Sequence, residues 1–122
     1  MISPPKDSNR FIWTQHIKKK MVFYSISASQ IRSILRKADR TEESIVPGLF
    51  ASMKKNHKKN KKEELWLMYL ILENQNSKKI KLISVWRYPG ITEKGKELQI
   101  PEDVLFDIVD VCNISCVSKF GF

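Results

Sequence analysis

Cysteine is scarce in this chain, and its scarcity excludes two common classes of small protein. The two cysteines, Cys112 and Cys116, stand four residues apart near the C-terminus, with no histidine beside them. That pair does not match the disulfide framework of a small secreted domain, and a structural zinc site needs four ligands. We therefore expect two reduced, partly buried thiols, and neither a metal nor any other cofactor.

Long apolar runs are also missing. The first ten residues, MISPPKDSNR, hold no apolar stretch of signal-peptide length. The longest apolar run, Leu65–Leu72, is far too short to span a bilayer. These absences predict a cytoplasmic protein without a membrane partner.

Negative charge is in the minority. The chain has 22 Lys and Arg against 13 Asp and Glu, which gives a net charge of +9. Such an excess favours polyanionic partners, namely RNA, DNA, an acidic protein or an anionic membrane, and among these we favour nucleic acid. The net charge indicates which kinds of partner the protein binds and does not indicate its fold.

The length of 122 residues indicates one domain that can bury a hydrophobic core without the support of disulfides or metal ions. Residues 1–10, with two prolines and several charges, read as a flexible lead-in. We expect a single domain over 11–112 and a C-terminal tail over 113–122.

Two helices are predicted near the N-terminus. Phe11–Trp13 is either a short strand or a hydrophobic staple, and Thr14 is placed to cap a helix over Gln15–Tyr24. On that helix His16 and Lys20 are neighbours at i, i+4.

The second helix has a clearer start. Ser27 followed by Gln30 forms a capping box, and apolar residues then recur at helical spacing to a predicted end near Asp39. Arg32 and Arg36 fall on or beside its solvent face.

Strands follow. ESIVPGLFASMKK is broken at Pro47–Gly48, which indicates one bent strand or two short ones. Leu65–Leu72 has the length of a central strand buried on both faces. The next strand alternates, and a polar, turn-prone segment joins these two as an antiparallel hairpin. On one face of that strand we expect Ile80, Leu82, Ser84 and Trp86, and on the other Lys81, Ile83, Val85 and Arg87.

A last helix begins at Pro101, with Glu102 and Asp103 in its first turn. The order predicts an α+β fold: two N-terminal helices, an antiparallel sheet of three or four strands and a C-terminal helix, with the helices packed on one face of the sheet.

The most basic stretch is KKNHKKNKK, which joins two predicted strands and should protrude as a hairpin loop. It is either a finger that tracks phosphates or a solubilising loop, and His57 within it is expected to be solvated. Its lysines are Lys54, Lys55, Lys58, Lys59, Lys61 and Lys62.

Three side chains near the end of the alternating strand also suit nucleic acid. Arg87 offers a rigid fork for phosphate, while Trp86 and Tyr88 offer rings on which a base can stack. The alternatives are that Trp86 packs in the core and that Arg87 pairs with an acid, Glu42 or Glu43.

His16 has two interpretations. An imidazole titrates at about pH 6.5 and suits proton transfer, with Lys20 one turn away to bind phosphate. A histidine near the start of a helix is also a common structural residue.

The stretch HIKKKMVFYSISASQIRSIL resembles the opening of a family of small uncharacterised bacterial domains similar to RelE-type toxins, within the barnase, EndoU, colicin and RelE ribonuclease group. The family pattern is His, three residues, a basic residue, Met, then Ile-Ser and an amphipathic helix. The DRTEESI, WLMYLIL and ISVWRYPG segments also fall where this likeness expects them, and it covers roughly Phe11 to Gly90. The matching residues are His16, Lys20, Met21, Ile26, Ser27 and Ile31.

This resemblance implies a RelE-like sheet and RNA cleavage by attack of a ribose 2′-hydroxyl on its own phosphate. His16 would be the acid or base, with Arg87 and Lys20 stabilising phosphate charge. Tyr24 departs from the family, which often has a second basic residue there. The resemblance also implies RNA or the ribosome as partner, and an acidic antitoxin protein.

Three hypotheses follow. The first is a toxin-type RNA-binding domain acting as a metal-independent endoribonuclease. The second is a non-catalytic RNA-binding module that uses the basic loop and the VWRYPG strand. The third is a protein-interaction domain of the immunity or antitoxin type that kept the fold and lost the chemistry.

Overall fold

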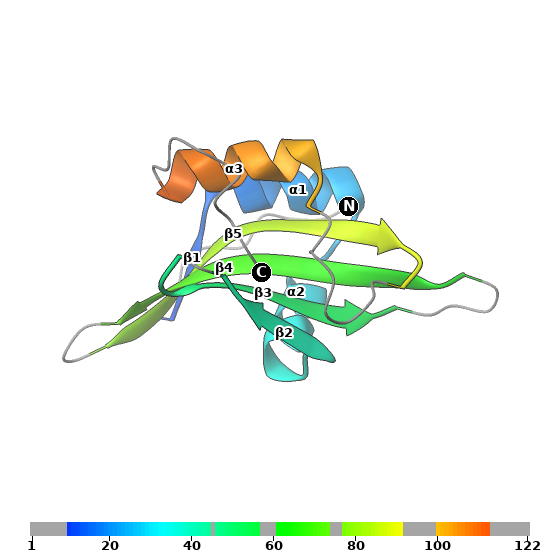
Figure 1. Cartoon of the computed structure of the whole chain (residues 1–122), viewed down its shortest axis with the longest axis horizontal. Coiled ribbons are helices and arrows are strands. Elements are labelled where there is room, and N and C mark those ends of the chain that lie inside the picture. The colour runs from blue at the N-terminus through cyan, green and yellow to red at the C-terminus, as the bar shows by residue number, and fades with distance from the viewer. Residues whose placement is uncertain (1–9, 45, 57–60, 74–76, 92–99, 113–122) are drawn as a thin grey trace.

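One mixed sheet organises the chain. The computed structural model describes residues 10–44, 46–56, 61–73, 77–91 and 100–112, and the side chains as far as residue 110. Within these residues the sheet has five strands in the order β1-β5-β4-β3-β2 (Figure 1). The elements are β1 (Phe11–Trp13), α1 (Gln15–Tyr24), α2 (Ala28–Arg36), β2 (Arg40–Glu43), β3 (Leu49–Lys55), β4 (Glu63–Glu73), β5 (Lys78–Pro89) and α3 (Glu102–Cys112).

The predicted α+β class is confirmed, and the sheet differs in two respects. Its described strands number five, where three or four were expected, and it is mixed rather than antiparallel. Both differences come partly from β1, which pairs in parallel with Ile80–Leu82 of β5, while the other neighbours pair antiparallel. The predicted tail and all but Arg10 of the predicted lead-in lie outside the described residues.

The long strand β4 separates two apolar clusters. Leu65 and Leu67 point into a cluster with α1 and α2, whereas Trp66 and Met68 point into a cluster with α3. Strand side chains alternate between faces, so the uninterrupted apolar run serves both sides, as predicted. The prediction that the helices share one face is wrong, because α3 covers the face opposite α2 (Figure 1).

A bulge in β5 breaks the expected alternation. Met68 pairs with Ser84 and the next residue, Tyr69, pairs with Leu82, so Ile83 has no partner on β4. One unpaired residue reverses the facing of everything beyond it. Leu82 therefore lies with α1 and α2, and Ile83 faces α3.

The helix starts agree with the sequence. Thr14 caps α1 by accepting the Ile17 amide, and Ser27 with Gln30 makes both bonds of the capping box on α2. The second helix ends at Arg36, short of the predicted Asp39, because the Asp39 amide donates to Met53 of β3 at 2.8 Å. The chain has already turned there toward the sheet.

Two strands, β2 and β3, pair antiparallel on either side of Pro47–Gly48, rather than one bent strand. The first of them begins at Arg40 and shares only Glu43 with the stretch in which it was predicted. Gly48 has a φ of 82°, which glycine adopts without strain, and its carbonyl accepts the Ile71 amide at 2.8 Å. The turn is thereby fixed to β4.

α1 runs along the edge of β5 beyond the end of the short strand β1. Thr14, at its start, donates to the Leu82 carbonyl, and Arg87, at its far end, bonds the last carbonyls of the helix. Ile17 consequently enters the cluster with α2, while Lys20 reaches α3 on the other side. No helix in the described part of the chain is long and apolar enough to cross a membrane.

Candidate nucleic-acid interface

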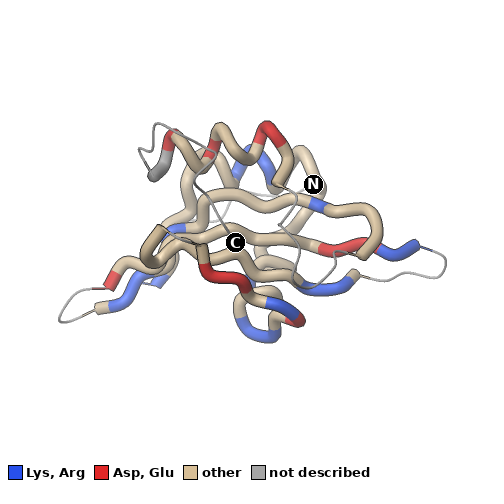
Figure 2. Tube along the Cα trace, in the orientation of Figure 1, with Lys and Arg blue, Asp and Glu red and all other residues tan. Residues whose placement is uncertain are grey.

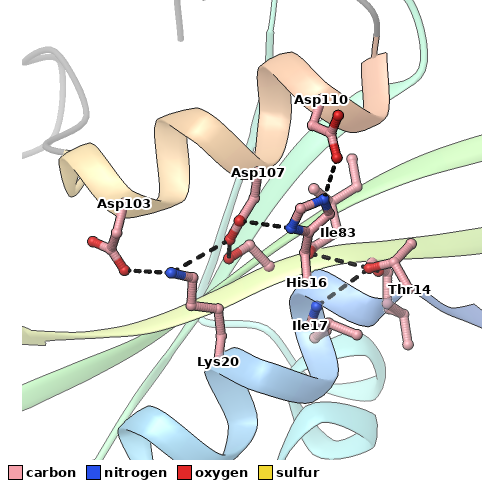
Figure 3. Close-up of polar contacts among 10 residues, drawn as sticks. Thr14, His16, Ile17, Lys20, Ile83, Asp103, Asp107 and Asp110 are labelled. Carbon is pink, nitrogen blue, oxygen red and sulfur yellow. Dashed lines mark hydrogen bonds and ion pairs between the residues drawn. The ribbon is translucent and has the colours of Figure 1, made fainter.

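His16 lies between two carboxylates of α3 (Figure 3). Its Nδ1 is 2.9 Å from Asp107 Oδ1, and its Nε2 is 2.6 Å from Asp110 Oδ2. Each ring nitrogen therefore faces one carboxylate, and the ring bridges α1 and α3.

Lys20 joins the same network one turn further along α1. Its Nζ is 2.7 Å from Asp103 Oδ2 and 3.7 Å from Asp107 Oδ2. Ser84 of β5 also donates to Asp107 at 2.8 Å. Asp107 is buried, so these partners offset the cost of removing its charge from water.

Tyr24 closes the row of α1 side chains that face α3. Its hydroxyl donates to Asp103 Oδ2 at 3.4 Å. Burial, followed by the negative charges of Asp103 and Asp107, raises the pKa of the Tyr24 phenol above its usual value. The phenol therefore remains a donor at neutral pH.

Arg87 has a structural environment of its own. Its guanidinium donates to the Tyr24 carbonyl at 2.5 Å and the Ser25 carbonyl at 2.8 Å, and Nη1 lies 2.6 Å from Glu63 Oε2. The last carbonyls of a helix lack intrahelical partners, and a cation there also suits the helix dipole. The alternative prediction of a pair with Glu42 or Glu43 is wrong, because the acid is Glu63.

The three residues to which the resemblance assigns catalysis, His16, Lys20 and Arg87, are not brought together. Lys20 lies near His16, but Arg87 binds the opposite end of α1, where the helical rise from His16 to Tyr24 is about 12 Å. The groups around His16 are carboxylates and not an open cationic surface. This geometry gives the predicted trio no common phosphate site.

The two aromatic residues of the VWRYPG segment differ in placement. Trp86 is 0% exposed and stacks parallel to Trp66 with ring centroids 6.2 Å apart. Its predicted role as a platform for bases is wrong, since a buried ring cannot meet a base. Tyr88 is half-buried against the same cluster, and its role stays a prediction.

The predicted basic loop does join two antiparallel strands, β3 and β4. Lys54 turns back to α2 and donates to Ser33 at 2.5 Å, while Lys55, Lys61 and Lys62 are exposed. The other predicted members, Lys58 and Lys59, lie outside the described residues, as does His57.

A second basic region borders a concavity of about 310 Å³ on the opposite side of α2. Sequence reasoning did not single it out, although Arg32 and Arg36 at i, i+4 on α2 were a usable signal. The guanidinium of Arg32 lies 5.6 Å from the centre of the Trp13 ring. The cations that line the concavity are Arg10, Arg32, Arg36 and Lys78.

These two regions form what we name the basic α2 surface. Figure 2 shows basic positions on α2 and toward the ends of the long strands, and acidic positions along α3. A smaller concavity of about 130 Å³ between α2 and the end of β3 connects α2 with the root of the loop. The basic α2 surface comprises Arg10, Arg32, Arg36, Lys54, Lys55, Lys61, Lys62 and Lys78.

The three aspartates of α3, Asp103, Asp107 and Asp110, are already engaged by α1. Across the described residues, no group of three or more His, Cys, Asp or Glu side chains could hold a metal ion. Lys20 and His16 both contact Asp107 instead.

Comparison with known proteins adds no relative. No protein-family model matches the chain, and no curated protein or solved structure matches it either. The resemblance to RelE-like domains therefore stays a prediction from the sequence.

Proposed function

We propose that this protein is an RNA-binding module and that RNA lies across the basic α2 surface. The observation that carries the proposal is the separation of charge: Asp103, Asp107 and Asp110 of α3 are paired with α1, while cations border both concavities beside α2. Phosphate backbones bind to such surfaces by releasing counterions. The resemblance to RelE-like domains favours RNA as the polyanion, free or within the ribosome.

In this proposal the protein binds RNA, and the three predicted catalytic residues, His16, Lys20 and Arg87, do not cleave it. His16 and Lys20 are held by the acids of α3, and Arg87 is held by the end of α1 and by Glu63. Contacts within the fold thus account for the presence of each of these residues. The endoribonuclease hypothesis would need these groups to leave those partners and meet at one phosphate.

The first test moves charge without changing its total. Arg32→Gln with Arg36→Gln removes two cations from the basic α2 surface, and Glu102→Gln with Asp110→Asn removes two anions from α3. The fourfold variant keeps the net charge of +9. Each lost phosphate contact should cost roughly fourfold at 0.15 M salt, so we expect the double arginine variant to bind a fluorescent RNA about 16-fold more weakly.

The fourfold variant should bind as weakly as the double arginine variant, because the position of the charge matters. Recovery of wild-type affinity would mean that net charge alone drives binding, and the proposal would fail. Competition by polyglutamate as effective as competition by RNA would instead support the acidic-protein alternative.

Salt dependence tests the loop. Replacing Lys58, Lys59, Lys61 and Lys62 with Gln should weaken binding and flatten the plot of log affinity against log salt, by up to about 3 if all four contact phosphate. An unchanged slope would remove the loop from the interface.

His16→Ala tests the catalytic hypothesis. We expect the wild-type protein to leave RNA intact, and we expect the His16→Ala variant to bind RNA as tightly as wild type does.

A further inference from the structure

The larger concavity beside α2 combines an apolar floor with a cationic rim. It lies where α2, β1 and the paired ends of β4 and β5 meet. Four apolar side chains and a tyrosine line it, and all five belong to the cluster under α1 and α2 or pack against it. They are Phe11, Leu35, Tyr69, Ile71 and Ile80.

Its size suits one nucleotide. A volume of about 310 Å³ lies at the lower end of the range for small-ligand pockets. An apolar lining accepts the faces of a base, and an aromatic side chain such as Phe11, which is half-buried, is the usual stacking partner. A paired base has both its neighbours stacked and its edge occupied, so it cannot enter.

The rim suits phosphate. Arg32 is held near the face of Trp13, so its position is set before any ligand arrives. Arg36 follows one helical turn later, and Lys78 stands on the facing end of β5. Guanidinium groups bind phosphate through paired hydrogen bonds, and an ammonium adds a point charge.

We infer that this concavity holds one unpaired nucleotide, so that the ligand of the module is single-stranded RNA. The base lies on the apolar floor and its phosphate meets Arg36 and Lys78. This inference rests on the proposed function and narrows its substrate class. It predicts discrimination between single strands and duplexes that a flat basic surface does not provide.

Adjacent residues of β4 supply a matched pair of variants. Ile71 lines the concavity, whereas Leu72 lies on the other side of the strand and is 40% exposed. Ile71→Trp fills the space without changing the charge, and Leu72→Trp adds the same ring elsewhere. With a 12-nucleotide RNA and a duplex of the same strand, we expect Ile71→Trp to lose about tenfold for the single strand and less than twofold for the duplex.

Leu72→Trp should leave both affinities within twofold of wild type. A charge pair gives the same comparison if Ile71→Trp impairs folding: Arg36→Gln with Lys78→Gln against Lys37→Gln with Lys79→Gln. We expect only the first pair, which lines the concavity, to reduce the preference for the single strand.

The outcomes separate the two proposals. If wild type binds RNA but holds the duplex as tightly as the single strand, or if both members of each pair behave alike, the inference about the concavity is overturned and the RNA-binding proposal stands. If wild type binds neither RNA more tightly than a control protein of equal size and charge, the RNA-binding proposal itself is overturned.

Discussion

The α1–α3 side and the α2 side of this molecule use charge in different ways. Between α1 and α3, Lys20 lies 2.7 Å from Asp103, and His16 lies within hydrogen-bonding distance of Asp107 and Asp110. Around α2, Arg36 and Lys78 surround a concavity, with apolar side chains between them. Charge that is compensated inside the fold holds elements together, and charge arranged around a hollow is suited to a ligand.

The largest effect should come from the core behind α3. Trp86→Ala removes a fully buried ring stacked on Trp66, so we expect the free energy of unfolding to fall by about 3–5 kcal/mol. Urea denaturation followed by tryptophan fluorescence measures it. A loss below about 1 kcal/mol would contradict the core assignment and return Trp86 to the list of surface candidates.

The acidic network gives a comparison between two partners of one histidine. Asp107→Ala leaves Ser84 and Lys20 without a buried acceptor, and should cost about 2–3 kcal/mol. Asp110 is 73% exposed, so Asp110→Ala should cost less than about 1 kcal/mol. If chemical denaturation showed that the two variants lose the same free energy of unfolding, the contribution of each carboxylate would not depend on its burial.

Arg87 should matter for stability and little for RNA. Arg87→Met removes the donors that satisfy the Tyr24 and Ser25 carbonyls, and should lower the free energy of unfolding by about 1–2 kcal/mol. Single-stranded RNA affinity of the folded variant should stay within about twofold of wild type. A large loss of affinity with unchanged stability would place Arg87 in the binding surface and break the distinction between the two sides.

Arg36 should show the reverse. Its side chain is exposed on α2, so Arg36→Gln should change the free energy of unfolding by less than about 0.5 kcal/mol. The same variant should bind single-stranded RNA roughly fourfold more weakly, as expected for one lost phosphate contact. Measured together, Arg36→Gln and Arg87→Met compare one guanidinium that serves a ligand with one that serves the fold.

Local signals in the sequence were sufficient for much of the fold. The capping box joins Ser27 to Gln30, only three residues away. The uninterrupted apolar run Leu65–Leu72 indicates by itself a strand that is buried on both faces. The break at Pro47–Gly48 is equally local. Each of these depends on interactions that a short window contains.

The parts that could not be predicted depend on distant pairs. The bulge at Ile83 adds one residue and leaves no mark in an otherwise regular strand. The acids of α3 lie far along the chain from His16, and nothing in the sequence of either segment indicates that the other is its partner. The same holds for Arg87, whose acid proved to be Glu63 rather than Glu42 or Glu43.

The basic concavity was missed for the same reason. Its rim combines Arg10 before β1, Arg32 and Arg36 on α2, and Lys78 on β5. Sequence reasoning placed the arginines of α2 on a solvent face but had no means of placing Lys78 opposite them. Density of charge along the chain drew the interpretation to the Lys54–Lys62 loop.

The placement of α1 along β5 has a consequence for how this sheet meets other molecules. The edge strand there, β1, is only three residues long, and Thr14 occupies the Leu82 carbonyl of β5 just beyond it, so a strand from another chain finds only a short ladder to join. The opposite rim is β2, whose four residues are all polar and three of them charged: Arg40, Glu42 and Glu43. Charged rims discourage strand addition between copies, which protects a sheet with so apolar a central strand from aggregation.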